Sequence, residues 1–166
     1  DGSLADTEMV SIAVNEAGNQ RPVLAAIGNR IVNEGANLTF GVTAAEPDSD
    51  SLILSVVNLP ANALFTDNFD GSGIFSFDPD FTQAAIINVT VIASDGILAD
   101  SEVVQIPVND VNRAPVLSTI GPRNVTEGQG LAFNALSSDP DGTIPVLTAQ
   151  SLPAGATFND NANGTG

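Results

Sequence analysis

The sequence contains no cysteine, histidine, lysine, tryptophan or tyrosine, and each absence excludes a class of function. Without cysteine there is no disulfide, no thiolate metal site and no cysteine nucleophile. Without histidine there is no imidazole general base, no Ser-His-Asp triad and no histidine-ligated zinc. Without lysine there is no Schiff base and no Lys–Asn isopeptide bond. We therefore expect that the chain is not an enzyme.

Positive charge is also scarce, because four arginines face 20 acidic residues and the formal net charge is −16. Binding to nucleic acid requires clustered positive charge that neutralises phosphates, so nucleic acid is not an expected partner. No apolar run approaches the roughly 20 residues of a membrane-spanning helix, so no membrane insertion is expected. An acidic, cysteine-free protein of this kind is typical of a microbial exterior, and we expect an extracellular or cell-surface location.

The chain repeats itself with a period of about 93 residues. Residues 1–15 match residues 95–109 at ten of 15 positions, and residues 19–73 match residues 112–166 without gaps at 24 of 55 positions. A period of this length fits a whole small domain, because solenoid repeats are shorter.

The frame of the repeat predicts three parts. Residues 1–17 are expected to hold the last strand of a preceding repeat, residues 20–110 one complete repeat, and residues 113–166 the first half of a following repeat. Two explanations for the incomplete parts stay open. The chain is either a piece of a long tandem array, or a subunit of an extracellular filament or sheath whose strands are exchanged between neighbouring chains.

The complete repeat shows apolar residues at every second position in short segments, which is the pattern of β-strands. We expect a first strand split into Val23–Ile27 and Ile31–Val32, and a last strand that Pro107 places at a sheet edge or at a bulge. The same alternation predicts a strand over Thr7–Val14. Seven short strands with Gly, Asp, Asn and Pro between them predict an all-β fold, a tandem array of immunoglobulin-like seven-stranded β-sandwiches. The other expected strands are Leu38–Val42, Leu52–Val56, Ala63–Thr66, Gly73–Phe77, Ile87–Ala93 and Val104–Val108.

The acidic residues gather at the expected strand ends and turns, and they recur there in both copies. Several carboxylates at one end of a sandwich repel one another unless a cation joins them. Calcium binds six to eight oxygen ligands, and a chain without histidine or cysteine offers only such hard ligands. The pattern therefore predicts weak calcium binding, with an affinity of roughly 10⁻⁴–10⁻³ M as in other extracellular modules.

Three motifs together resemble the cadherin-like and dystroglycan-type ("putative Ig") repeats of large microbial surface proteins. They are Asn112-Arg113-Ala114-Pro115-Val116, Val125-Thr126-Glu127-Gly128 and Asp139-Pro140-Asp141-Gly142, and the complete repeat has counterparts of each. In that family calcium lies at the junction between successive domains. The acid positions and this resemblance together give the candidate calcium ligands, which are Glu16, Asn19, Glu34, Glu46, Asp48, Asp50, Asp95, Asp110, Asn112, Glu127, Asp139 and Asp141.

The linkers depart from the cadherin linker Asp-x-Asn-Asp-Asn-x-Pro. The segment Asp110–Pro115 is one residue shorter and has Arg113 where that linker has an acid. We therefore expect fewer calcium ions per junction than in cadherins. Pro22 and Pro115 hold the chain extended at the start of each repeat.

These observations predict a structural or adhesive extracellular module that forms an extended stalk or fibre. Its expected partners are neighbouring repeats of the same chain, further copies in a fibre, and a surface glycan or protein. A glycan-binding β-sandwich is a further alternative, although the usual Trp and Tyr platforms are absent. The pair Asp78 and Asp80 is explained by a turn, not by a catalytic carboxylate pair, because no oxyanion device or nucleophile elbow accompanies it.

Overall fold

The structure, a computed structural model, describes residues 2, 5–14 and 18–166. It comprises two compact units, Asp1–Asp110 and Val111–Gly166. The described residues form ten β-strands and no α-helix. It follows that, in this part of the chain, no helix exists that could cross a membrane.

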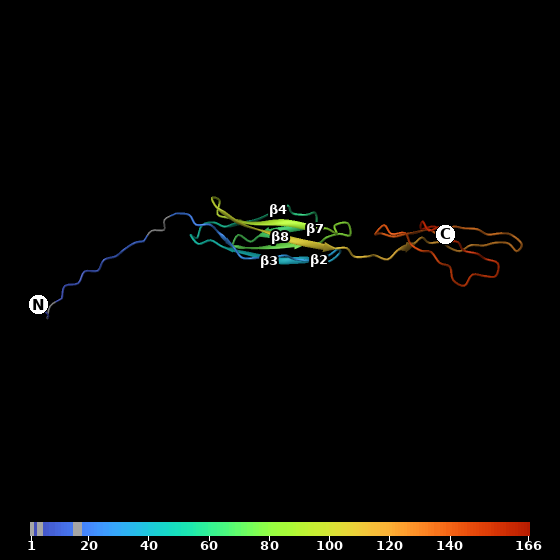
Figure 1. Cartoon of the computed structure of the whole chain (residues 1–166), viewed down its shortest axis with the longest axis horizontal. Coiled ribbons are helices and arrows are strands. Elements are labelled where there is room, and N and C mark those ends of the chain that lie inside the picture. The colour runs from blue at the N-terminus through green and yellow to red at the C-terminus, as the bar shows by residue number, and fades with distance from the viewer. Residues whose placement is uncertain (1, 3–4, 15–17) are drawn as a thin grey trace. The chain divides into compact units, whose positions relative to one another are not determined.

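The first unit is a sandwich of two four-stranded sheets, which Figure 1 shows with their strands side by side. One sheet has the strand order β1-β3-β6-β5, and the other β2-β8-β7-β4. All neighbours are antiparallel except β2 and β8, which are parallel. The strands are β1 (Val23–Leu24), β2 (Val32–Asn33), β3 (Leu38–Ala45), β4 (Ile53–Val57), β5 (Ala63–Asp67), β6 (Ser72–Phe77), β7 (Ile86–Ser94) and β8 (Ala99–Asn109).

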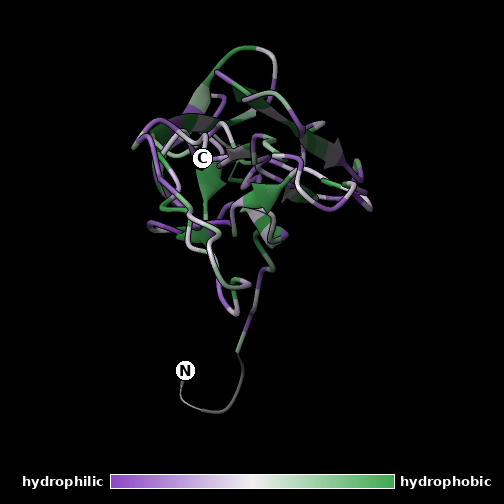
Figure 2. Ribbon diagram, turned by 90° about the vertical axis from the view of Figure 1, so that its right-hand side faces the viewer, coloured by the Kyte–Doolittle hydropathy of each residue, from purple (hydrophilic) through white to green (hydrophobic). Residues whose placement is uncertain are grey.

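The core lies between the two sheets, because alternate residues of each strand point to the same face. Phe75 and Phe77 of β6 are fully buried, as their spacing predicts. The ring of Phe75 stacks on that of Phe40 with centroids 4.8 Å apart. Figure 2 shows hydrophobic residues along several of the strands, and a mixture of hydrophilic and hydrophobic residues in the loops. Apolar side chains fill the core, which contains neither the disulfide nor the tryptophan of antibody domains because the chain has no cysteine and no tryptophan.

The first strand is split as predicted, and its two halves, β1 and β2, belong to different sheets. The prediction that Pro107 lies at a sheet edge or at a bulge is wrong, because β8 lies between β2 and β7 and pairs with β7 in an unbroken register. Pro107 pairs with Ile86 of β7. On its other side β2 pairs only with Val108 and Asn109. Proline is accommodated there because the neighbouring strand begins just beyond it.

The predicted strand Thr7–Val14 is not formed, since none of residues 5–14 belongs to a strand. Its counterpart, β8, is held by β7 on one side and β2 on the other. A strand is stable only with a hydrogen-bonded neighbour. Alternation predicted which residues could form a strand but could not supply the partner.

The second unit repeats the first half of the first unit. Its strands β9 (Val116–Leu117) and β10 (Ser137–Ser138) pair antiparallel. A bridge between Leu136 and Thr165 extends the pairing in the register that joins β3 to β6 in the first unit. Phe133 is half exposed, whereas its counterpart Phe40 is buried.

Candidate functional site

The linker that leads into the first unit is fixed by two acidic residues of that unit. Gln20 donates its backbone N–H and its side-chain Nε2–H to the two carboxylate oxygens of Asp48, which lies in the loop between β3 and β4. The side-chain amide of Asn19 donates to Asp95 Oδ2 at 2.9 Å. The structure thus brings the predicted ligands Asn19 and Asp95 together through a direct hydrogen bond.

Asp95 also organises the turn between β7 and β8. Its Oδ1 accepts hydrogen bonds from the backbone N–H groups of Ile97 and Leu98, each at 2.7 Å. The Leu98 amide lowers the pKa of the Asp95 carboxyl, desolvation partly opposes it, and the Ile97 amide and the Asn19 side chain lower the pKa further. Asp95 is therefore an anion that receives donors from both the hairpin and the linker.

Glu46 contains the only buried side-chain polar atom, among those in the described residues, that lacks a hydrogen-bond partner. This atom is Oε1, while Oε2 accepts the backbone N–H of Asp50 at 2.8 Å. Both residues line a shallow hollow of about 390 Å³, next to the exposed ring of Phe69. An unpartnered carboxylate oxygen beside an open hollow suits a cation or a hydrogen-bond donor from outside.

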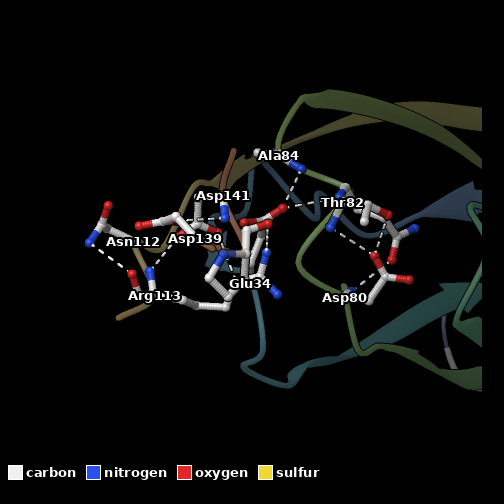
Figure 3. Close-up of polar contacts among 10 residues, drawn as sticks. Glu34, Asp80, Thr82, Ala84, Asn112, Arg113, Asp139 and Asp141 are labelled. Carbon is white, nitrogen blue, oxygen red and sulfur yellow. Dashed lines mark hydrogen bonds and ion pairs between the residues drawn. The ribbon is translucent and has the colours of Figure 1, made fainter. Parts of the chain in front are cut away.

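Glu34 lies at the opposite, C-terminal end of the first unit, where β2 ends. Its side chain is only 4% exposed. Its Oε1 accepts the backbone N–H groups of Gln83 at 3.0 Å and of Ala84 at 2.7 Å, as Figure 3 shows. The predicted ligand Glu34 therefore already ties the end of β2 to the start of β7. Asp110, predicted with it, is exposed.

The second unit repeats the arrangement of the linker with one change. Arg113 donates its backbone N–H to Asp141, and its Nε lies 2.7 Å from Asp141 Oδ1 in an ion pair (Figure 3). Asp139 accepts the backbone N–H of Asp141 at 2.8 Å, and Asn112 donates to the Arg113 carbonyl at 3.3 Å. Glu127, the counterpart of Glu34, is exposed.

The candidate ligands do not all come together. Glu16 lies outside the described residues. In the described ranges, no three acidic residues are grouped closely enough to hold a metal ion. At Asp141 the present arrangement does not suit calcium, because a guanidinium already faces the carboxylate. At the N-terminal end of the first unit it suits calcium better, because the donors from Asn19 and Gln20 are neutral and Glu46 offers an unpartnered oxygen.

Sequence reasoning missed the roles of Gln20 and Arg113. Arg113 departs from the cadherin linker, but the sequence did not indicate its partner, because Asp141 is 28 residues further along the chain. The signal was present in the repeat itself, because Gln20 and Arg113 occupy the same position and so do Asp48 and Asp141.

The bacterial Ig domain family matches residues 19–106, which is more than half of the chain. A curated relative, chitinase A of Pseudoalteromonas piscicida, is 31% identical over 111 residues. The match covers 66% of this chain but only 13% of the chitinase. The chain therefore corresponds to a small part of that enzyme.

Two solved structures resemble this chain. An endo-fucoidan hydrolase of glycoside hydrolase family 107 aligns over 92% of this chain and 24% of its own length, with a TM-score of 0.52 and 22% identity. The titin M3 domain aligns over 53% of this chain and 96% of its own length, with a TM-score of 0.41 and 14% identity. At 22% sequence identity, the alignment with the hydrolase indicates a shared fold and nothing about function. The chain belongs to the bacterial Ig domain family, and its architecture is a tandem arrangement of immunoglobulin-like β-sandwich repeats.

Proposed function

We propose that the chain is a non-catalytic, cadherin-like segment of an extracellular stalk or fibre, in which calcium stiffens the junctions between repeats. Its task is to space or display other parts of a surface protein. The observation that carries this proposal is the repeated fixation of the linker. Gln20 on Asp48 and Arg113 on Asp141 hold the linker against the same loop in two copies of the repeat.

Fixing a linker in this way limits the directions in which a repeat can lean. Each held residue is followed two positions later by a proline, Pro22 or Pro115, which restricts the backbone further. A chain without disulfides or isopeptide bonds has few other means of staying extended under load. Short, anchored linkers are therefore the expected device of a spacer.

Calcium would act at the N-terminal end of a repeat. In the first unit the proposed ligands are Asn19, Glu46, Asp48, Asp50 and Asp95, with Glu16 from the linker. Because no three acidic residues are grouped closely within the described ranges, these side chains would have to move toward the ion to bind it. In the second copy the corresponding residues are Asp110, Asn112, Asp139 and Asp141, but Arg113 already faces Asp141, so no ion is proposed there. At the far end of a repeat Glu34 already accepts two backbone N–H groups, and its counterpart Glu127 is exposed. The ion would supply positive charge that offsets the net charge of −16.

The test of the spacer is the shape of the whole chain in solution. Small-angle scattering in chelator and then in millimolar calcium should give a larger maximum dimension and a narrower distance distribution with calcium. The Asp48→Asn variant should lose part of this response. A distribution that is the same in both solutions would show that calcium does not stiffen the junctions.

A second candidate function is a filament subunit that exchanges strands between chains. Met9, Val10, Ile12 and Val14 are each at least 73% exposed, although the counterparts of the last three in β8 are buried. Such a segment can complete a sheet of another copy. Sedimentation should then show concentration-dependent association that Val10→Asp with Ile12→Asp abolishes. A chain that stays monomeric throughout would exclude the filament subunit.

A third candidate, glycan binding, has one observation in its favour. Phe69 is 77% exposed beside the hollow that holds Glu46 and Asp50, and an aromatic ring next to hydrogen-bond acceptors suits the face of a sugar. Titration calorimetry with neutral oligosaccharides should detect binding that Phe69→Ala removes. Heats that do not differ from dilution would exclude it.

A further inference from the structure

The first residue of each repeat donates hydrogen bonds to an aspartate at the equivalent position, but the donor groups differ between the two repeats. At Asp48 the donors from Gln20 are a backbone N–H and a neutral side-chain amide. At Asp141 the donors from Arg113 are a backbone N–H and a guanidinium, whose Nη2 also donates to the carbonyl of Pro140 at 2.7 Å. The two copies thus allow an internal comparison, in which the residue that holds the aspartate is neutral at Gln20 and positively charged at Arg113.

The guanidinium of Arg113 is well placed to act as a built-in cation. It is 31% exposed and Asp141 is 13% exposed, so the pair is partly shielded from water and salt. Arginine is charged at every working pH, and its planar fork keeps its geometry when it binds a carboxylate. The Arg113 amide and then its side chain lower the pKa of the Asp141 carboxyl, which keeps the partner ionised.

Calcium and this guanidinium would compete for one carboxylate. Both are cations, so an ion at Asp141 would have to displace Arg113 or remain close to a like charge. Gln20 brings no such charge to Asp48. Arg21, the next residue in the sequence, makes no ion pair within the described part of the chain.

We propose that Arg113 replaces calcium at the start of its repeat, so that Asp141 fixes this linker without an ion. The residue two positions before the proline then decides which junctions depend on calcium and which do not. Arginine gives a permanently fixed junction, and glutamine one that responds to calcium. The part of this inference that concerns Gln20 rests on the calcium role proposed above, whereas the part that concerns Arg113 does not.

The test is amide hydrogen exchange in the full chain, followed by NMR at residues 20 and 113. In chelator, Arg113→Gln should speed exchange at residue 113 roughly tenfold or more, because a charge-assisted anchor is lost. Millimolar calcium should restore protection in this variant and leave the wild-type residue unchanged. The amide of Ser118, which donates to Leu136 at 2.8 Å in the same unit, reports whether that unit stays folded.

The reverse substitution, made at residue 20, tests the same effect of charge in the complete first unit. Gln20→Arg should slow exchange at residue 20 in chelator and reduce its response to calcium. Arg21→Gln removes one positive charge from the neighbouring position and should change neither, which makes it the matched control.

The outcomes separate the two proposals. If residue 113 of the wild type needs calcium for protection, or if Arg113→Gln and Gln20→Arg leave exchange in chelator unchanged, the replacement of calcium by Arg113 is refuted. If both variants change exchange in chelator as expected but residue 20 of the wild type ignores calcium, Arg113 still fixes its linker by charge. In that case the calcium role at Gln20 fails.

Discussion

Glu34 accepts a hydrogen bond from the backbone N–H of Ala84 at 2.7 Å, although the two residues are 50 positions apart in the chain. The same oxygen accepts the N–H of Gln83. One buried carboxylate thereby joins the end of β2 to the segment that leads into β7. The contact closes the C-terminal end of the sandwich, where the sheet that contains β8 has its parallel pair.

Replacing Glu34 by alanine should lower the free energy of unfolding by about 2–4 kcal/mol, because two N–H groups lose a charged acceptor. Glu34→Gln keeps one acceptor oxygen and should cost about 1 kcal/mol. Urea unfolding measures both. The control is Glu127→Gln, because Glu127 is the exposed counterpart and its replacement should change little. Equal losses for Glu34→Gln and Glu127→Gln would contradict the structural role of Glu34.

Gly73 is required by a close approach of its neighbours. A Cβ at this position would lie 2.6 Å from Cζ of Phe65 and 2.9 Å from the carbonyl oxygen of Thr66. Gly73→Ala should therefore destabilise the first unit by about 1–3 kcal/mol through overpacking. Gly41 lies in β3 with no atom within 4 Å of such a Cβ, so Gly41→Ala should be neutral or slightly stabilising. Chemical denaturation of the two variants checks the contrast, and a Gly73→Ala variant as stable as Gly41→Ala would refute it.

Phe69 and Ala162 occupy the same position of the same turn, with φ of 61° and 56°. In each copy the N–H of this residue donates to an aspartate, Asp67 at 2.9 Å or Asp160 at 3.0 Å. The turn therefore does not need a phenyl ring. Phe69→Gly should raise the free energy of unfolding by about 0.5–1 kcal/mol, because glycine adopts positive φ without strain. A clear loss of stability in thermal melts would mean that the ring contributes to packing.

The carboxyl group of Asp80 makes the free energy of unfolding depend on pH in the acid range. The Thr82 hydroxyl donates to its Oδ1 at 2.6 Å and the Thr82 N–H at 2.9 Å, and these contacts lower the pKa of Asp80 below its ordinary value of 3.8. The folded pKa is thus lower than the unfolded one. The stabilisation is present above pH 3.8 and is lost as the pH falls through the folded pKa.

Thr82→Val should raise the pKa of Asp80, and an NMR titration of the carboxyl carbon measures the change. The pKa of Asp70, which is lowered in the same way by Ser72, serves as the internal control and should stay where it is. A titration of Asp80 that is the same in both proteins would show that the hydroxyl does not hold the carboxylate.

Sequence alone was sufficient for the fold class, because a strand period of two is a local property. Phe75 and Phe77 are separated by one residue, so they share a face, and both are buried. The two separate apolar segments of the first strand also predicted that this strand is split. The position of β8 inside a sheet could not be predicted from local sequence, because it depends on which strands pair with one another. Pro107 therefore suggested an edge that does not exist.

The candidate site could be predicted only in part. Turn positions of the acids are local, and the structure places Asp48 and Asp95 beside the linker, while their role as calcium ligands stays a prediction. The linker residues that donate to them, Gln20 and Asn19, are 28 and 76 positions away in the chain, and nothing in the local sequence indicates these partners. The carboxylate of Glu34 was expected to face a junction, yet the structure shows it buried against the amides of Gln83 and Ala84. The residue type alone does not show whether a carboxylate accepts backbone amides or binds a metal ion.

The most direct test of the calcium-stiffened spacer is the melting temperature of the full chain in chelator and in about 5 mM calcium. An affinity of roughly 10⁻⁴–10⁻³ M predicts about 1–2 kcal/mol of added stability. For a unit of this size that corresponds to a rise of about 4–15 °C. Asp48→Asn and Asp95→Asn should each reduce the rise. A melting temperature that is the same with and without calcium would contradict the central claim.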